Sequence, residues 1–170
     1  MHGGWGSAIL SRVSVDPPEH EPRRFADEAA IVRVGEGLLS RTLPKVEWTH
    51  EAHLAACVWL LLRRPDVLPE RDLRAIIGGY NEAVGGINDD TQGYHETLTQ
   101  LYVAEVRAHV AEMGEHASLV DVVDALLQSE RGHRSHPLRF YSRERLFSVE
   151  ARRGFVPPDL RPLGSTPREP

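Results

Sequence analysis

The sequence predicts an all-α protein: a single compact helical bundle of about five helices with an extended, proline-rich C-terminal arm. Apolar residues recur at the three- and four-residue spacing of amphipathic helices, and typical helix-starting and helix-ending residues flank these segments. No segment alternates apolar and polar residues as a half-buried strand would. We expect residues 1–24 to form a flexible N-terminal tail, residues 25–156 the helical domain and residues 157–170 the extended arm.

The first helix is expected at about residues 25–40, because Ala29, Val32 and Leu39 fall on one face at helical spacing. Gly35 weakens this prediction, since a glycine inside a helix costs roughly 1 kcal/mol relative to alanine. We nevertheless expect a helix here, because the apolar spacing is maintained on both sides of the glycine.

The second and third helices have clearer boundaries. Thr49 is a good N-cap residue, and its helix is expected to run to about Arg64, just before Pro65. The third helix is expected to start at Pro69, since proline suits a first turn, and to end at Gly85. Its apolar stripe consists of Leu73, Ile76, Ile77, Tyr80 and Val84.

Two further helices and a short turn complete the predicted body. The fourth helix is expected over about residues 92–113, the fifth is expected to begin at Ser118, and a short helical turn should follow Ser142. Residues 131–137 have the composition of an exposed connection. The first half of the arm is expected to be held on the body by Phe155, Leu160 and Leu163.

Composition narrows the range of functions. The chain has 170 residues, which suits one domain, and 41% of them are hydrophobic, which is enough for a core. A net charge of -5 argues against a general nucleic-acid binder, and the single cysteine, Cys57, fits a reducing compartment. No apolar run approaches the ~20 residues of a membrane span, and the N-terminus lacks the pattern of a signal peptide. We expect a cytoplasmic protein that binds neither nucleic acid nor membrane.

Histidines stand near the starts of two predicted helices. His50 and His53 are three residues apart beside the apolar stripe of the second helix, so both rings can reach one ion. His95 lies on the apolar stripe near the start of the fourth helix. If the second, third and fourth helices run up, down and up with short connections, the second and fourth are parallel. The three histidines would then meet at one end of the bundle.

Two or three histidines with a carboxylate are typical of catalytic zinc and non-haem iron sites. We therefore expect a divalent metal, zinc or iron, held by His50, His53 and His95. Glu96 would be a fourth ligand or a general base, and Tyr94 a proton donor. The leading hypothesis is a metalloenzyme that acts on a small molecule, with its reaction type open. Other acids expected close enough to serve as ligands are Glu47, Glu51, Asp89 and Asp90.

Two alternatives remain open for this chain. In one, the histidines are structural and the chain is a non-catalytic helical binding or interaction module. In the other, a closed coordination shell makes it a metal sensor or carrier. The His-x-x-His spacing has low specificity for metal, and the positive end of a helix dipole disfavours a bound cation.

Four segments carry a resemblance to a known group of proteins. They are WTHEAHL at 48–54, GYHETLT at 93–99, FYSRERL at 140–146 and PDLRPL at 158–163. These segments resemble those of a family of small, uncharacterised bacterial all-helical proteins. The resemblance covers about residues 46–163 and implies that these segments belong to one recurring unit, without implying a reaction.

Overall fold

The computed structural model describes residues 22–164, and within that range it contains α-helices and short 3₁₀ helices but no strand. The all-α prediction is therefore confirmed. Residues 1–21 and 165–170, which hold most of the predicted tail and the end of the predicted arm, lie outside the described residues. None of the helices in the described range combines the length and apolar character of a membrane span. In chain order the elements are α1 (Glu28–Leu39), η1 (Lys45–Glu47), α2 (His50–Arg63), α3 (Pro69–Ala83), α4 (Glu96–Met113), α5 (Leu119–Gln128), η2 (Glu130–Gly132), η3 (His136–Arg139), α6 (Arg143–Leu146) and α7 (Val149–Arg153).

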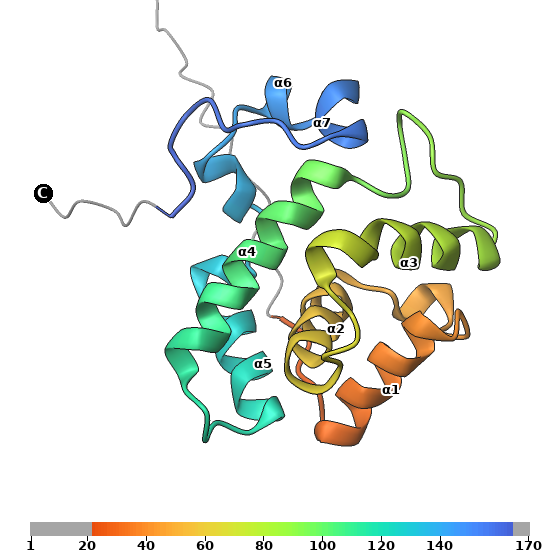
Figure 1. The fold of residues 1–170 in the computed structure, drawn as a ribbon, viewed down its shortest axis with the longest axis vertical. Coiled ribbons are helices and arrows are strands. Elements are labelled where there is room, and N and C mark those ends of the chain that lie inside the picture. Colours follow the sequence, from red (N-terminus) through yellow and green to blue (C-terminus); the bar gives the residue numbers. More distant parts are fainter. Residues whose placement is uncertain (1–21, 165–170) are drawn as a thin grey trace, which may run out of the picture.

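Helix α2 is the centre of the fold. It lies between α1 on one side and α4 and α5 on the other, and it also contacts α3 (Figure 1). The helix starts where the Thr49 hydroxyl accepts a hydrogen bond from the Ala52 N–H at 3.3 Å. Its residues from Leu54 to Leu60 are all buried. A helix that is apolar around most of its circumference is covered on every side, so the neighbouring helices are arranged around α2.

The buried face of α1 differs from the predicted one. Ala29 is exposed, and Val32 and Leu39 are only partly buried. The face that packs on α2 is set by Gly35, because a Cβ at this position would lie 2.1 Å from a ring carbon of Trp59. The glycine that weakened the sequence-based prediction therefore allows α1 to pack closely against Trp59 of α2. The residues that α1 buries are Ile31, Val34, Gly35, Gly37 and Leu38.

The bounds of α2, α3, α5 and α6 agree with the predicted boundaries, whereas α4 begins later than expected. Gly93 has a φ of 81°, a left-handed conformation that a helix does not continue through. His95 follows as the N-cap in extended conformation, with a φ of -138°. His95 therefore precedes the helix instead of standing inside its first turn.

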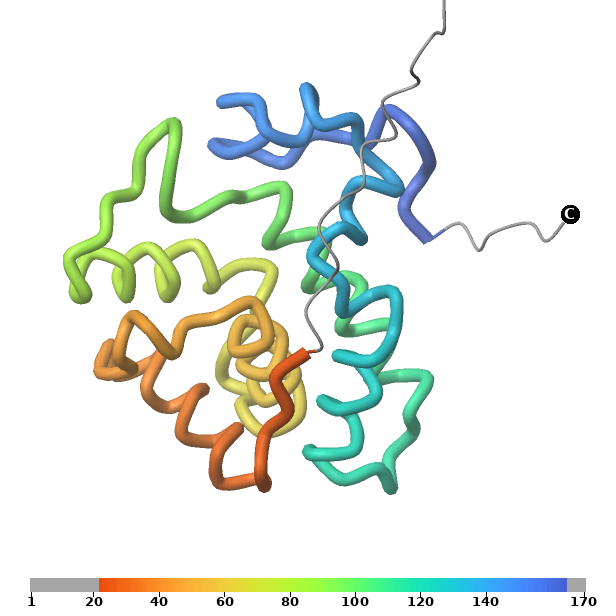
Figure 2. Tube along the Cα trace, turned by 180° about the vertical axis from the view of Figure 1, so that it is seen from behind, coloured from red at the N-terminus to blue at the C-terminus, as the bar shows by residue number. Residues whose placement is uncertain are grey.

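Helices α2 and α4 do not form the predicted parallel pair. In Figure 1, α2 is seen nearly along its axis, whereas α4 runs across the picture, and Figure 2 shows the same crossing from behind. The prediction relied on short connections, but the connection from the end of α3 to the start of α4 spans residues 84–95 and contains no helix. A connection of that length does not impose an antiparallel path.

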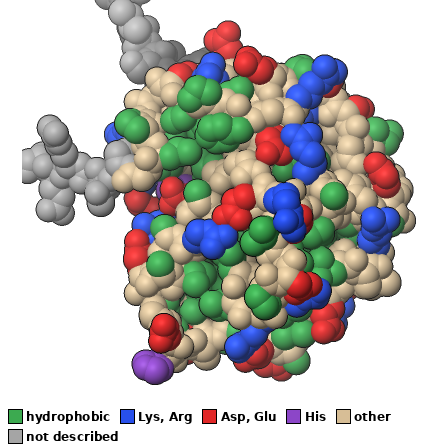
Figure 3. All heavy atoms as spheres, viewed as in Figure 1, with side chains coloured by type: hydrophobic (Ala, Val, Ile, Leu, Met, Phe, Trp, Pro, Cys, Tyr) green, Lys and Arg blue, Asp and Glu red, His purple; other side chains and the backbone are tan. Residues whose placement is uncertain are grey.

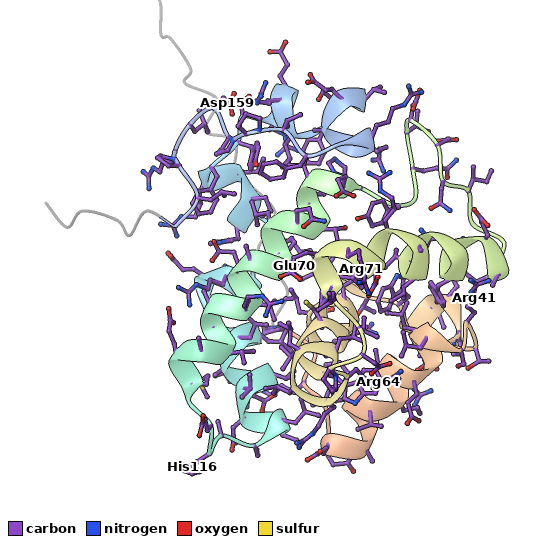
Figure 4. All side chains as sticks on the ribbon, in the orientation of Figure 1. Arg41, Arg64, Glu70, Arg71, His116 and Asp159 are labelled. Carbon is purple, nitrogen blue, oxygen red and sulfur yellow. The ribbon has the colours of Figure 1, made fainter. Side chains whose placement is uncertain are left out.

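The segment after α5 builds a second, smaller core against α4. Val156, which is 3% exposed, takes the anchoring role predicted for Phe155 and Leu160, which are 50% and 57% exposed. The Tyr141 hydroxyl donates to the Val156 carbonyl at 2.8 Å, and the Asp159 carboxylate accepts the backbone N–H of Ser142 at 2.8 Å. Asp159 lies beside the start of α6, as Figure 4 shows. The buried members of this second core are Leu101, Phe140, Tyr141, Leu146, Ala151 and Val156.

The surface carries charged side chains of both signs. Arginines and acids are interspersed over the face drawn in Figure 3. Glu70, labelled in Figure 4, pairs with Arg107 at 2.6 Å, and Arg64 pairs with Asp66 at 2.7 Å. Exposed pairs of this kind contribute ~0–1 kcal/mol each. Stability therefore depends mainly on the two cores.

We predict that Gly35→Ala destabilises the fold by about 1–3 kcal/mol, because the added methyl group would overlap the Trp59 ring. The matched control is Gly78→Ala in α3, where the nearest atom to the new Cβ is 3.9 Å away. Alanine in an unobstructed helix should be neutral or stabilising by about 0.5–1 kcal/mol. Urea unfolding measures both, and equal effects of the two substitutions would contradict the role given to Gly35.

Candidate functional site

A cavity of about 440 Å³ lies between α2, α3 and the start of α4. Four of the residues predicted to form a site, His50, His53, Tyr94 and His95, are on its wall, whereas Glu96 is not. We call this space the histidine cavity. Most of its wall is apolar. Its lining consists of Leu38, Trp48, His50, His53, Leu54, Ala56, Cys57, Leu60, Leu73, Ile77, Asn81, Gly93, Tyr94, His95, Leu98, Thr99, Tyr102, Val103 and Arg134.

His53 presents an exposed ring to this cavity. Its Nδ1 lies 2.6 Å from the Thr49 carbonyl oxygen, and because that oxygen only accepts, Nδ1 carries the proton and Nε2 a lone pair. The ring stacks on Trp48, with 3.8 Å between centroids. Surrounding protein lowers the pKa of His53 to about 4, chiefly by desolvation. The ring is exposed, so water opposes part of this desolvation. The ring is mostly neutral at pH 7 whether its pKa is lowered or stays at the ordinary value of 6.5.

His50 ties α2 to a distant part of the chain. Its Nε2 donates to the carbonyl oxygen of Gly132 in η2, at 2.8 Å. The edge of the ring meets Tyr102 of α4, with 5.4 Å between centroids. His50 therefore links three elements at one side of the cavity.

His95 uses both of its ring nitrogens within the fold. Nδ1 accepts the N–H of Leu98 at 3.3 Å, which caps α4, and Nε2 donates to the carbonyl of Leu146 in α6 at 3.0 Å. The side chain is 7% exposed. Burial, followed by the positive charge of Arg152, lowers the pKa of His95. The neutral ring is thereby fixed as a structural link between α4 and the second core.

Tyr94 and Glu96 are bonded to each other. The Tyr94 hydroxyl donates to Glu96 Oε2 at 2.8 Å, and burial, followed by that hydrogen bond, raises the pKa of Tyr94. Arg74 contacts the same oxygen at 2.9 Å, and Gln100 donates to Glu96 Oε1 at 2.9 Å. Both carboxylate oxygens are therefore occupied. The proton-donor and general-base roles of this pair stay predictions, and they require these bonds to open.

Three of the four acids expected near the histidines are engaged elsewhere, whereas Glu51 is buried and its Oε2 has no hydrogen-bond partner among the described residues. Glu47 pairs with Arg33, and Asp90 pairs with Arg153 at 2.6 Å. Asp89 accepts the N–H and hydroxyl of Thr91, which hold its pKa down at about 2. The carboxylates of these three acids therefore already have partners within the fold.

The residues at the cavity do not fit a three-histidine metal centre as they are placed. Within residues 22–164 there is no group of three or more histidine, cysteine or acidic side chains arranged to hold a metal ion. A ligand histidine needs one unprotonated nitrogen to bind the metal, and the only such nitrogen of His95 already accepts a hydrogen bond. His50 and His53 remain candidate ligands, so the metal site stays a prediction that requires His95 to move.

Sequence reasoning missed a buried polar cluster on the other side of α4. Gly132, His136 and Pro137 are buried, so only residues 133–135 form the exposed connection that was expected over residues 131–137. His136 Nε2 lies 3.4 Å from Glu105 Oε2, and Arg131 contacts Glu105 at 3.1 Å. Neither ring nitrogen of His136 makes a well-aligned hydrogen bond. Pro137 could have indicated the start of the short helix η3, but no local signal indicated the burial of His136.

We predict that acidification destabilises the folded chain, because His53 and His95 both have folded pKa values below their ordinary 6.5. Below about pH 6.5 the unfolded imidazoles take up protons that the folded ones do not, so stability is lost as the pH falls. For His53 this window extends down to about 4. Urea unfolding at a series of pH values measures the loss.

The control for this pH dependence is His95→Asn. Asparagine keeps an oxygen that can cap α4, but it does not titrate. The variant should therefore lose less stability on acidification than the parent chain. An identical pH dependence in the two proteins would contradict the assignment of His95 as a neutral buried link.

The histidine cavity is thus the feature that gathers most of the predicted site residues. It presents the exposed imidazole of His53 and the partly buried one of His50 within a mainly apolar wall. No family model, curated protein or solved structure matches the chain. The resemblance of its segments to a bacterial all-helical family therefore stays a prediction.

Proposed function

We propose that this chain binds a small, largely apolar molecule in the histidine cavity. The observation that supports this best is a space of about 440 Å³ whose wall is mainly aliphatic and aromatic and includes the exposed imidazole of His53. Ligand pockets are commonly concave, apolar and supplied with a few polar groups that orient the ligand. An apolar cavity of ~150 Å³ already accommodates benzene, so this one has room for a larger molecule.

Binding is better supported than proton-transfer catalysis. A general base works best when its pKa lies near the operating pH, whereas the pKa of His53 is lowered to about 4. Burial raises the pKa of the Cys57 thiol to about 12, so little thiolate is present to act as a nucleophile. Tyr94 and Glu96 are bonded to each other. The groups around the cavity are therefore suited to holding a neutral molecule.

A metal-dependent function remains the second candidate. It is favoured by the position of His50 and His53, which both line the cavity from the first turn of α2. When bound, zinc or iron would polarise an oxygen of the ligand or activate water. Holding it with three histidines would require His95 to give up the cap of α4, which costs about 1 kcal/mol.

We predict that propylbenzene raises the thermal unfolding midpoint of the chain. A ligand that binds only the folded state, at ~10 times its dissociation constant, adds about 1.4 kcal/mol of stability. Calorimetric scans over a series of ligand concentrations measure the effect. Ala56, which is 1% exposed and lines the cavity, supplies the test variant, because Ala56→Leu fills part of the space.

The matched control adds the same atoms outside the cavity, at the exposed Ala29 of α1. Ala29→Leu should respond to propylbenzene as the parent chain does, whereas Ala56→Leu should respond less. Absence of any shift in the parent chain, with propylbenzene and with its hydroxyl-bearing analogue 4-propylphenol alike, would rule out the proposed binding function. An equal shift in both variants would place the bound ligand elsewhere.

The metal-dependent candidate predicts one equivalent of metal in protein produced without a histidine tag or after incubation with Zn²⁺ or Fe²⁺. Elemental analysis after dialysis measures it. The metal should be lost in His50→Ala and His53→Ala. Retention in both variants would exclude these ligands, and a parent chain that retains none would exclude the metal-dependent function itself.

A further inference from the structure

The imidazole and hydroxyl groups on the wall of the histidine cavity have a common hydrogen-bonding pattern: their proton donors are already used. His50 donates to Gly132, His53 to Thr49 and His95 to Leu146, in each case to a backbone carbonyl oxygen. Buried donors that have found partners inside the protein are costly to redirect, because the carbonyls they leave would lose their bonds.

The hydroxyl groups of the wall follow the same pattern, and so does one N–H of its amide, Asn81. Tyr102 donates to the carbonyl of His133 at 2.8 Å, and Thr99 donates to the carbonyl of His95 at 2.9 Å. Tyr94 donates to Glu96, as described above. Asn81 directs an N–H at Asn88 Oδ1, at 3.0 Å. The protein itself therefore takes up the hydroxyl and imidazole protons of this wall.

The His53 ring leaves one acceptor open to a ligand. The Nε2 lone pair of His53 has no hydrogen-bond partner among the residues that the structure describes, and the side chain is exposed at the cavity. The equivalent lone pair of His95 is taken by the N–H of Leu98. Among these two rings, only His53 can therefore receive a proton donor from a molecule in the cavity.

The charge around the cavity favours a neutral ligand. No aspartate or glutamate is among its lining residues, and its one cationic residue is Arg134. The Arg134 side chain is 71% exposed and lies 3.9 Å from Glu51, which partly balances its charge. A charged group placed against the apolar interior would lose its hydration without a close counter-ion.

We infer that the ligand of the histidine cavity is a neutral, mainly apolar molecule with a hydroxyl or N–H donor that bonds to His53 Nε2. This inference rests on the proposed binding function and names the class of its ligand. It also assigns His53 as the residue that determines specificity, with Trp48 holding its ring in place by stacking.

The test compares three ligands of similar shape on the full chain, with affinities measured by calorimetric or NMR titration. They are 4-propylphenol, which carries a neutral donor, propylbenzene, which carries none, and 4-propylbenzoate, which carries an anion. We expect the phenol to bind about 3- to 10-fold more tightly than propylbenzene, as one net hydrogen bond allows. The benzoate should bind more weakly than the phenol.

Two substitutions of His53 separate the hydrogen bond from the shape of the wall. His53→Phe keeps an aromatic ring beside Trp48 but removes the acceptor, so the preference for the phenol over propylbenzene should disappear. His53→Gln keeps an acceptor oxygen and should retain part of the preference. If the phenylalanine variant does not fold, the glutamine variant and the three-ligand series still decide the question.

Each result has a separate meaning. Failure of all three ligands to bind the parent chain would contradict the proposed function. Binding of propylbenzene as tightly as the phenol would leave that function intact and overturn the inferred ligand class. Tightest binding of the benzoate would also overturn it, since Arg134 would then be the recognising group. A phenol preference that survives in His53→Phe would overturn the role of His53.

Discussion

The burial of α2 is the constraint on which the rest of the structure depends. Its residues from Leu54 to Leu60 are covered on all sides, so four helices must pack around it. Polar side chains on α2 are consequently confined to its ends. His50 and His53 occupy the first turn, where the packed surface gives way to the histidine cavity. The position of the candidate site therefore follows from the packing of the central helix.

A second physical theme is the use of histidines as links between segments. His50, His95 and His109 each hydrogen-bond the carbonyl of a residue outside their own helix: Gly132, Leu146 and Val122. A neutral imidazole that donates to a carbonyl satisfies a buried acceptor without placing a charge in the core. His53 bonds the carbonyl of Thr49, the cap of its own helix, and is exposed, and its second nitrogen has no hydrogen-bond partner among the described residues. This difference separates the structural histidines from the one proposed to contact a ligand.

Much of the fold could be predicted from local signals. Thr49, Pro69 and Ser118 mark helix starts because capping groups and proline act within one turn of the chain. The start of α4 was predicted too early, because the left-handed conformation of Gly93 depends on the loop around it. The crossing of α2 and α4 was missed because their relative orientation arises from packing across the whole domain. Spacing along a helix carries no information about that packing.

The sequence predicted which histidines lie at the candidate site better than it predicted what each of them does there. The histidine-bearing turns do reach one cavity, but the hydrogen-bond partners that decide their chemistry come from Leu146 and Gly132, far away in sequence. Such partners leave no local pattern. The burial of His136 beside Glu105 was hidden for the same reason, since a polar loop composition favours exposure until the fold covers it.

The protonation state of His53 tests the account most directly. Nitrogen-15 NMR of the histidine rings, recorded over a pH series on the intact chain, reports which nitrogen carries the proton and where each ring titrates. We expect His53 to be the neutral Nδ1–H form near neutral pH and to gain a proton only towards a pKa of about 4. A His53 ring protonated on Nε2, or one that is already charged near neutral pH, would contradict the claim that this cavity offers an open acceptor.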